Sequence, residues 1–147
     1  MVEKQLSDIY YGNYSLFQSL PDVWAIDQLF PIMPIHLLDT KPTRQAILSD
    51  ITCDSEGKID RFIGRGGVEE TLALHVPPEG DDYILGVFLV GAYQETLGDL
   101  HNLLGDTNVM SITYDDEGKF LFHNELEGDT IAEVLSYVEY DTKQMEA

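Results

Sequence analysis

Cys53 and Asp54 are neighbouring side chains that could share one chemical site. They end the apolar run 46–52 and precede the turn Ser55–Gly57, so we expect them at the end of a strand. The alternation of side chains stops where a strand ends, so a thiol and a carboxylate can face one site there. The alternative is a small buried thiol beside an aspartate that caps the turn, and the residue types alone favour that alternative.

Tyr93 occupies a comparable place, at the exit of the apolar run 83–93 and directly after Gly91-Ala92. A tyrosine there is usually a core residue with its hydroxyl at the surface, although the hydroxyl could also be offered to a ligand. Both interpretations stay open. Cys53 is the only cysteine, so the chain can form neither an internal disulfide nor a thiolate zinc site.

Other candidate motifs favour structural roles. No two histidines stand four residues apart on an expected helix, so metal binding is disfavoured. They are His36, His75, His101 and His123. The glycine-rich segment 64–67 neither follows a clear strand nor opens a helix, which favours a loop over a phosphate cradle. The acidic segments 115–117 and 125–129 lack the spacing of a calcium loop and are typical of solvated turns.

In the first half of the chain, the pattern predicts short elements that would position these residues. We expect a short helix within 2–10, a strand at 15–18 and a helix from Pro21 that carries apolar residues as far as Leu29. Two β-compatible runs follow at 45–53 and 68–76, separated by glycine-rich turns.

The second half begins with the run 84–93, which is apolar on both faces and predicts a central strand. Four leucines within 97–104 form a helical stripe that ends at Gly105. A hairpin is expected at 110–122, about an acidic turn. The last helix begins at a capping box of Thr130 and Glu133. These elements predict an α+β, mostly β fold with a sandwich-like arrangement.

Length and charge narrow the function classes. The 147 residues are the size of a single domain, over 1–147. Acidic residues number 27 and basic residues 8, a net charge of −19, which excludes nucleic acid and anionic membranes as partners. The start of the chain has no apolar signal segment and the longest apolar run is too short to span a bilayer, so we expect a cytoplasmic protein. A hydrophobic content of 44% is sufficient for a folded core.

The two motifs 51–55 and 91–95 together resemble the C-terminal part of the alanine-racemase-fold decarboxylases, which use pyridoxal phosphate (PLP) and act on ornithine, diaminopimelate and arginine. Further segments are similar to the biosynthetic arginine decarboxylases of bacteria and plants, at 10–22, 27–31 and 101–107. The resemblance implies their C-terminal β-sandwich or barrel-like domain.

The resemblance also implies roles for the three candidates. Cys53 would lie near substrate and cofactor and help to protonate the decarboxylated intermediate. Asp54 would bind the guanidinium of L-arginine, and the Tyr93 hydroxyl would contact the PLP phosphate. In this superfamily the Cys-Asp motif reaches into the other subunit of a homodimer, so the site is composite. The substrate-binding aspartate of ornithine decarboxylases aligns clearly with neither Asp22 nor Asp27.

The family holds PLP on a lysine of an N-terminal (β/α)8 barrel, which takes about 250 residues. This chain has no room for it, so we expect it to be inactive alone and to act with a barrel domain or a full-length subunit. The family's product is agmatine, which leads to putrescine and spermidine. The resemblance is also compatible with magnesium as a cofactor. The alternative is a non-catalytic interaction or relic module that pairs with a full-length decarboxylase. A small pyruvoyl-type enzyme would need a serine self-cleavage site, which is not evident.

Overall fold

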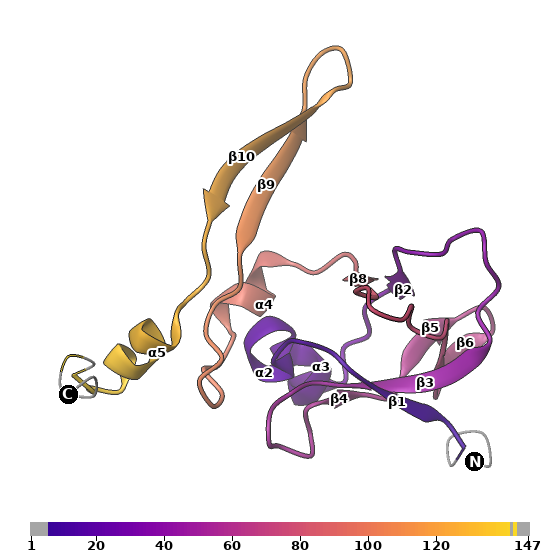
Figure 1. Cartoon of the computed structure of the whole chain (residues 1–147), viewed down its shortest axis with the longest axis horizontal. Helices are drawn as coiled ribbons and strands as arrows, with labels where there is room; N and C mark the ends of the chain where they lie inside the picture. The colour runs from indigo at the N-terminus through magenta and orange to yellow at the C-terminus, as the bar shows by residue number, and fades with distance from the viewer. Residues whose placement is uncertain (1–5, 142, 144–147) are drawn as a thin grey trace. The chain divides into compact units, whose positions relative to one another are not determined.

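The computed structural model describes residues 6–141 and 143 (Figure 1). The chain packs as two compact units, residues 1–98 and 99–147, and each is described by itself. The expected single domain over residues 1–147 stays a prediction. Within the described part of the chain, no helix has the length and apolar content needed to cross a membrane.

The first unit is built on strand β3 (Arg44–Ser49), which has neighbours on both edges. Strand β1 (Asp8–Tyr11) runs parallel along one edge. Strands β4 (Lys58–Ile59) and β7 (Leu72–Leu74) pair antiparallel with the two ends of β3. Ala46 and Leu48 alternate toward the core, as a strand with one buried face requires.

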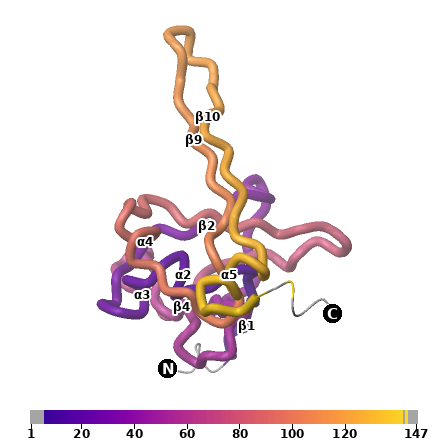
Figure 2. The backbone as a smooth tube through the Cα atoms, turned by 90° about the vertical axis from the view of Figure 1, so that its left-hand side faces the viewer, coloured from indigo at the N-terminus to yellow at the C-terminus, as the bar shows by residue number. Residues whose placement is uncertain are grey.

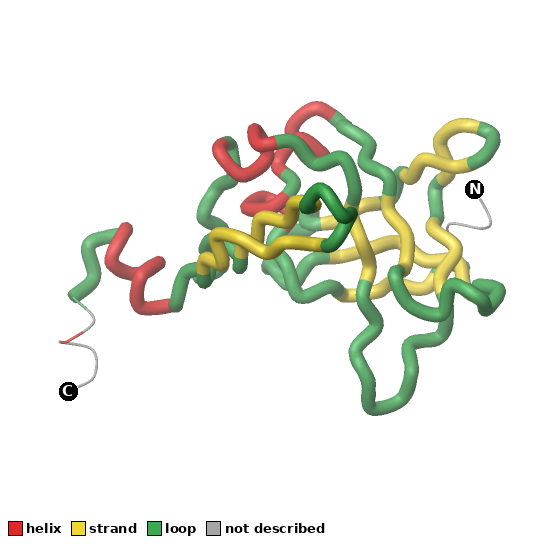
Figure 3. The backbone as a smooth tube through the Cα atoms, turned by 90° about the horizontal axis from the view of Figure 1, so that it is seen from above, coloured by secondary structure: helices red, strands yellow, loops and turns green. Residues whose placement is uncertain are grey.

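Two small antiparallel sheets complete the strands of this unit. Strand β2 (Ile32–Pro34) pairs with β8 (Leu85–Val87). Strand β5 (Phe62–Gly64) pairs with β6 (Gly67–Glu69) through the glycine-rich segment, which is therefore a hairpin turn. All of these sheets are open (Figure 3).

Over the residues described, the first unit has three short helices, and one of them contributes a residue to its core. They are α2 (Leu16–Ser19), α3 (Pro21–Ile26) and α4 (Ala92–Thr96). The core joins a residue of α2 with residues of the strands and of the segments between elements: Leu16, Leu20, Phe30, Ala46, Leu48, Ile59, Phe62 and Leu74. The expected α+β, mostly β class is confirmed.

Helix α2 corrects the strand expected at 15–18. Ser15 is its N-cap, and the Ser15 hydroxyl accepts the Gln18 N–H at 3.3 Å. The helix has only four residues, too few for helical periodicity to be visible in the sequence. The helix expected within 2–10 is also wrong where it can be tested, because β1 begins at Asp8; residues 1–5 lie outside the described part.

The apolar run 84–93 is not the central strand. Only β8 is extended, and it pairs with β2 away from β3. The strand cannot continue through Leu89, because its φ of 60° is incompatible with extended backbone. Tyr93 then falls inside α4. The helix expected at 97–104 is also wrong: α4 ends before it, and the second unit has only an isolated bridge from His101 to Leu104 there.

The second unit confirms the two clearest predictions. Strands β9 (Val109–Tyr114) and β10 (Phe120–Leu126) form an antiparallel hairpin, whose two strands run side by side in Figure 2. Helix α5 (Ile131–Tyr137) begins at the predicted capping box. The Thr130 hydroxyl accepts the Glu133 N–H at 3.3 Å, and the Glu133 carboxylate accepts the Thr130 N–H at 2.8 Å.

Candidate functional site

Cys53 and Asp54 lie on the turn that joins β3 to β4, and both are exposed. The Asp54 carboxylate accepts the Glu56 N–H at 2.9 Å, and the Asp54 carbonyl accepts the Gly57 N–H at 3.1 Å. This is the turn-capping arrangement that an aspartate provides at such a place. The cysteine is not the buried thiol that the residue types favoured. The turn therefore presents a thiol and a carboxylate side by side at the surface.

Beneath this turn lies Asp50, whose exposure is only 1%. One carboxylate oxygen accepts the Leu16 N–H at 2.8 Å. The other accepts both donors of Thr52, the N–H at 3.0 Å and the hydroxyl at 2.8 Å. Three donors satisfy the buried charge, so its burial is supported. Asp50 was not singled out in the sequence; the available signal was an aspartate that interrupts an apolar run.

Tyr14 lies close enough to Asp50 for the carboxylate to act on its phenol. Burial, and then the negative charge of Asp50, raise the pKa of Tyr14 well above its ordinary value of 10.0. The Tyr14 carbonyl also accepts the Ile51 N–H at 3.2 Å, which ties the turn to the segment before α2. The Tyr14 side chain is therefore a neutral phenol at physiological pH.

Tyr93 is the second residue of α4, and 76% of its side chain is exposed. The next residue, Gln94, is buried and pairs with Asp22 at the start of α3. The side-chain oxygen of Gln94, Oε1, accepts the Asp22 N–H at 3.1 Å. The side-chain nitrogen, Nε2, donates to the Asp22 carboxylate at 2.5 Å. Asp22 is thus engaged in the fold, whereas the exposed Asp27 forms an ion pair with Arg61 at 3.4 Å.

All three candidates lie in the first unit, on segments attached to the helix pair α2–α3. The turn with Cys53 and Asp54 is tied to the first residue of α2, and α4 packs against α2 and bonds to α3. A small cavity of about 100 Å³ lies between α3 and β4, and Glu56 of the same turn is part of its lining. Its lining includes Trp24, Lys58 and Arg61 and none of the three candidates.

The histidines and acidic segments have structural contacts. His75 is buried, with one ring nitrogen 2.8 Å from the Tyr83 hydroxyl and the other 2.8 Å from the Thr40 carbonyl. Asp115 closes the β9–β10 turn by accepting the Lys119 N–H at 2.8 Å. Over the residues that the structure describes, no group of three or more His, Cys, Asp or Glu side chains could hold a metal ion, so magnesium gains no support.

No family model matches the chain. The chain is similar in sequence to several biosynthetic arginine decarboxylases. The enzyme of Rhodopirellula baltica is 56% identical over 144 residues, which is 98% of this chain and 21% of that protein. Biosynthetic arginine decarboxylase 1 of Synechocystis is 55% identical over 153 residues, 98% of this chain and 22% of that protein. The enzyme of Shewanella loihica is 50% identical over 140 residues.

A solved structure agrees with these sequences. The crystal structure of the biosynthetic arginine decarboxylase of Campylobacter jejuni superposes with a TM-score of 0.80 at 40% identity, over 94% of this chain and 22% of that chain. Sequence and fold together match the C-terminal domain of a decarboxylase. The particular enzyme whose domain it matches is biosynthetic arginine decarboxylase, and the chain spans about a fifth of the length of these relatives.

Proposed function

We propose that this chain supplies Cys53, Asp54 and Tyr93 to the composite active site of a PLP-dependent arginine decarboxylase, which converts L-arginine into agmatine and carbon dioxide in the cytoplasm. The observation that carries the proposal is the match over 98% of the chain to biosynthetic arginine decarboxylases. The exposed turn with Cys53 and Asp54 supports it, because a site shared with other polypeptide needs side chains that reach outward.

Asp54 is proposed to bind the guanidinium of the substrate. A carboxylate and a guanidinium are planar, and two parallel N–H···O bonds can join them. The Glu56 N–H already holds one Asp54 oxygen at 2.9 Å, which restricts the rotation of the carboxylate. A carboxylate held in one orientation loses less entropy on binding, which favours recognition of a planar cation.

Cys53 is proposed to deliver the proton that replaces carbon dioxide. The bond from the α-carbon to the carboxylate breaks, carbon dioxide leaves, and a C–H bond forms with the proton from the Cys53 Sγ. Solvent then returns a proton to the thiolate. The exposure of Cys53 supports this role, because a thiol must reach both the substrate and a proton source.

Tyr93 is proposed to donate its hydroxyl to the cofactor phosphate. When bound, PLP supplies the electron sink for decarboxylation. The three candidates are exposed. Exposed side chains fit a site that is completed by other polypeptide better than they fit a cofactor site enclosed within this chain. We therefore propose that a lysine outside this chain holds the cofactor.

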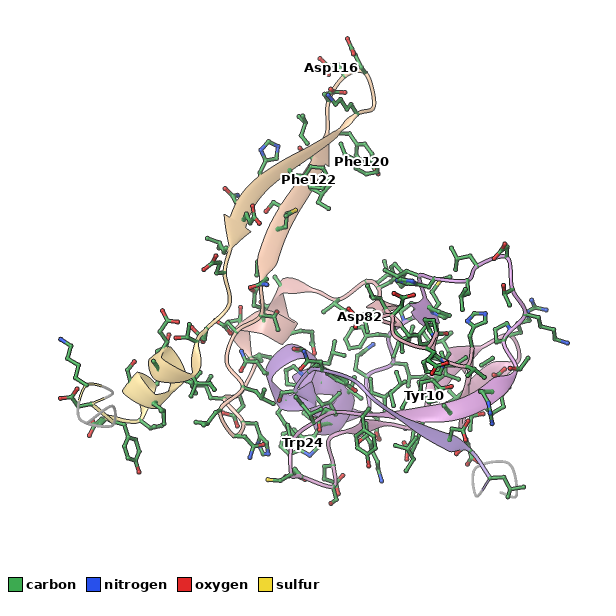
Figure 4. The ribbon with its side chains drawn as sticks, viewed as in Figure 1. Tyr10, Trp24, Asp82, Asp116, Phe120 and Phe122 are labelled. Atoms are coloured by element: carbon green, nitrogen blue, oxygen red, sulfur yellow. The ribbon has the colours of Figure 1, made fainter. Side chains whose placement is uncertain are left out.

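The β9–β10 hairpin is proposed as a contact surface for that other polypeptide. On one face, cross-strand neighbours form an exposed apolar patch: Met110, Ile112, Tyr114, Phe120 and Phe122. Figure 4 shows Phe120 and Phe122 projecting from the hairpin. A two-stranded hairpin is marginally stable alone, and apolar patches of this kind mark interaction surfaces. Because the chain matches only about a fifth of its relatives, we assign the patch to the remaining decarboxylase polypeptide.

The test mixes this chain with the complementary part of an arginine decarboxylase and measures carbon dioxide release from arginine. We expect the mixture to be active, and Asp54→Ala to abolish that activity because the guanidinium loses its partner. The matched control is Asp82→Ala, an aspartate on an exposed loop of the same unit (Figure 4), which should retain activity. Retained turnover in Asp54→Ala would overturn the role of Asp54.

The non-catalytic alternative makes a different prediction. A module that only associates with a full-length decarboxylase would bind it without changing turnover, whether residue 53 is cysteine or serine. We expect Cys53→Ser instead to reduce turnover in the mixture, because serine is a much weaker proton donor. Unchanged turnover with stable binding would favour the alternative.

A further inference from the structure

We propose that Asp50 and Gln94 are positioning residues that hold the two halves of the site on one helix pair, α2–α3. Asp50 positions the turn with Cys53 and Asp54, and Gln94 positions the helix with Tyr93. The inference rests on the proposed function, which gives these two segments a common task.

Asp50 joins the turn to the beginning of α2. Leu16 is the first residue of α2, so its N–H has no partner within the helix. The Asp50 carboxylate accepts that N–H from 34 residues away, at 2.8 Å. Its other oxygen accepts the N–H and hydroxyl of Thr52, the residue before Cys53. The same carboxylate therefore sets the position of the turn relative to the helix.

Gly57 closes the turn over this carboxylate. Its carbonyl accepts the Asp50 N–H at 2.7 Å, so the two ends of the turn are joined by backbone. A Cβ atom at Gly57 would lie 2.2 Å from the Asp50 carboxylate oxygen, closer than any real contact. Any side chain there would displace the carboxylate or the turn. The turn therefore packs directly against the Asp50 carboxylate at Gly57.

Gln94 performs the corresponding task for Tyr93. Only 5% of Gln94 is exposed, and both ends of its amide are used by Asp22, 72 residues away in sequence. Asp22 lies in the first turn of α3, so the pair attaches α4 to α3. Tyr93 directly precedes Gln94 on α4, and its direction follows from that attachment.

The helix pair links the two attachments. Leu20 is both the C-cap of α2 and the N-cap of α3, so no loop separates the helices. Leu16 and Leu20 are buried in the core cluster of the first unit. The attachment points at Leu16 and Asp22 therefore belong to one packed element, and the turn and α4 keep a fixed spacing.

The first test uses Thr52, a mild variant site that leaves the charge of Asp50 in place. In the reconstituted enzyme, Thr52→Val should raise the KM for arginine at saturating PLP by about tenfold, because loss of the hydroxyl loosens the turn. Thr52→Ser retains the hydroxyl and should keep the original KM. Asp50→Asn should raise KM further, up to about a hundredfold, because an amide cannot accept from both sides.

The second test uses Gln94→Leu, which should weaken PLP binding about tenfold and leave the KM for arginine at saturating PLP within about twofold. Two separate defects, one for each attachment, are the expected result. Equal effects of Thr52→Val and Thr52→Ser, or PLP binding unchanged by Gln94→Leu, would overturn the inference.

Exchange rates measured on this chain alone test the positioning role of Asp50 independently of the proposed function. Hydrogen exchange of the Leu16 and Thr52 amides should accelerate at least tenfold in Asp50→Asn, with circular dichroism confirming a folded chain. Unchanged rates would overturn the positioning role of Asp50. If these rates change as expected while Asp54→Ala keeps full turnover, the proposed function fails and the attachment by Asp50 stands.

Discussion

The Tyr14 phenol carries a hydroxyl that is buried without a hydrogen-bond partner among the residues described. A buried hydroxyl in that state costs about 1–3 kcal/mol of desolvation. It also faces the charge of Asp50, which together with burial raises its pKa above 10.0. The same phenol therefore makes the stability of the chain depend on pH in alkali.

The sign of that dependence follows from proton binding. Below pH 10.0 the Tyr14 phenol is protonated whether the chain is folded or unfolded. Above it, the unfolded chain loses the proton first and the folded chain keeps it, so the free energy of unfolding falls as pH rises. The slope is at most about 1.4 kcal/mol per pH unit for one group.

We expect Tyr14→Phe to reduce this alkaline slope, leaving the smaller part that the raised pKa of Tyr10 contributes. Stability at pH 7 should be unchanged or higher, because the phenylalanine buries no unpaired hydroxyl. Urea unfolding measured from pH 9 to 12 gives the free energies. Tyr11→Phe, at an exposed position of β1, is the matched control and should keep the original slope. An unchanged slope in Tyr14→Phe would contradict the assignment.

Among the elements, the β9–β10 hairpin has two faces that differ in chemistry. Phe122 pairs with Ile112 on the apolar face. Leu121 pairs with Thr113 on the other face, where Thr113 also contacts His123 at 2.9 Å. One apolar residue on each face therefore offers a matched pair of variants.

Phe122→Ser should weaken binding of this chain to the complementary decarboxylase polypeptide by tenfold or more, because burial of a phenylalanine contributes about 1.5–3 kcal/mol. Leu121→Ser, on the opposite face, should weaken it far less. Isothermal titration calorimetry measures both affinities. If Phe122→Ser instead abolished self-association of this chain and left that affinity unchanged, the patch would belong to a second copy.

Elements with local signals were predictable from the sequence, and elements set by distant contacts were not. The turn at Asp115 and the capping box at Thr130 are fixed by neighbouring residues, so the hairpin and α5 were found. The strand that contains β8 was predicted to be too long, because nothing in an apolar run indicates the positive φ of Leu89. Helix α2 was missed because its four residues are too few for helical periodicity, and an aspartate far along the chain completes its N-terminus.

The candidate site divides in the same way. Cys53, Asp54 and Tyr93 could be proposed from the sequence because their motifs are contiguous, and their roles stay predictions. Asp50 and Gln94 were missed because their partners lie 34 and 72 residues away. Residue types that bind a ligand can be recognised from the motif alone. Residues that place them are visible only after the chain has folded.

At the scale of the whole molecule, the net charge of −19 opposes the folded state. Like charges repel more strongly in a compact chain than in an unfolded one, and dissolved salt screens that repulsion. We expect the free energy of unfolding of this chain to rise between 10 and 300 mM sodium chloride, as measured by urea unfolding. A flat or falling dependence would show that attraction between opposite charges dominates.

The direct join between α2 and α3 has a consequence for when the entropy of ordering is lost. No loop separates the two helices, because Leu20 is the C-cap of one and the N-cap of the other. The turn held by Asp50 and the helix held by Gln94 are therefore brought together when the chain folds, before any ligand binds, and preorganisation of this kind lowers the entropic cost of binding. A flexible insertion at Leu20 would move that cost from folding to binding.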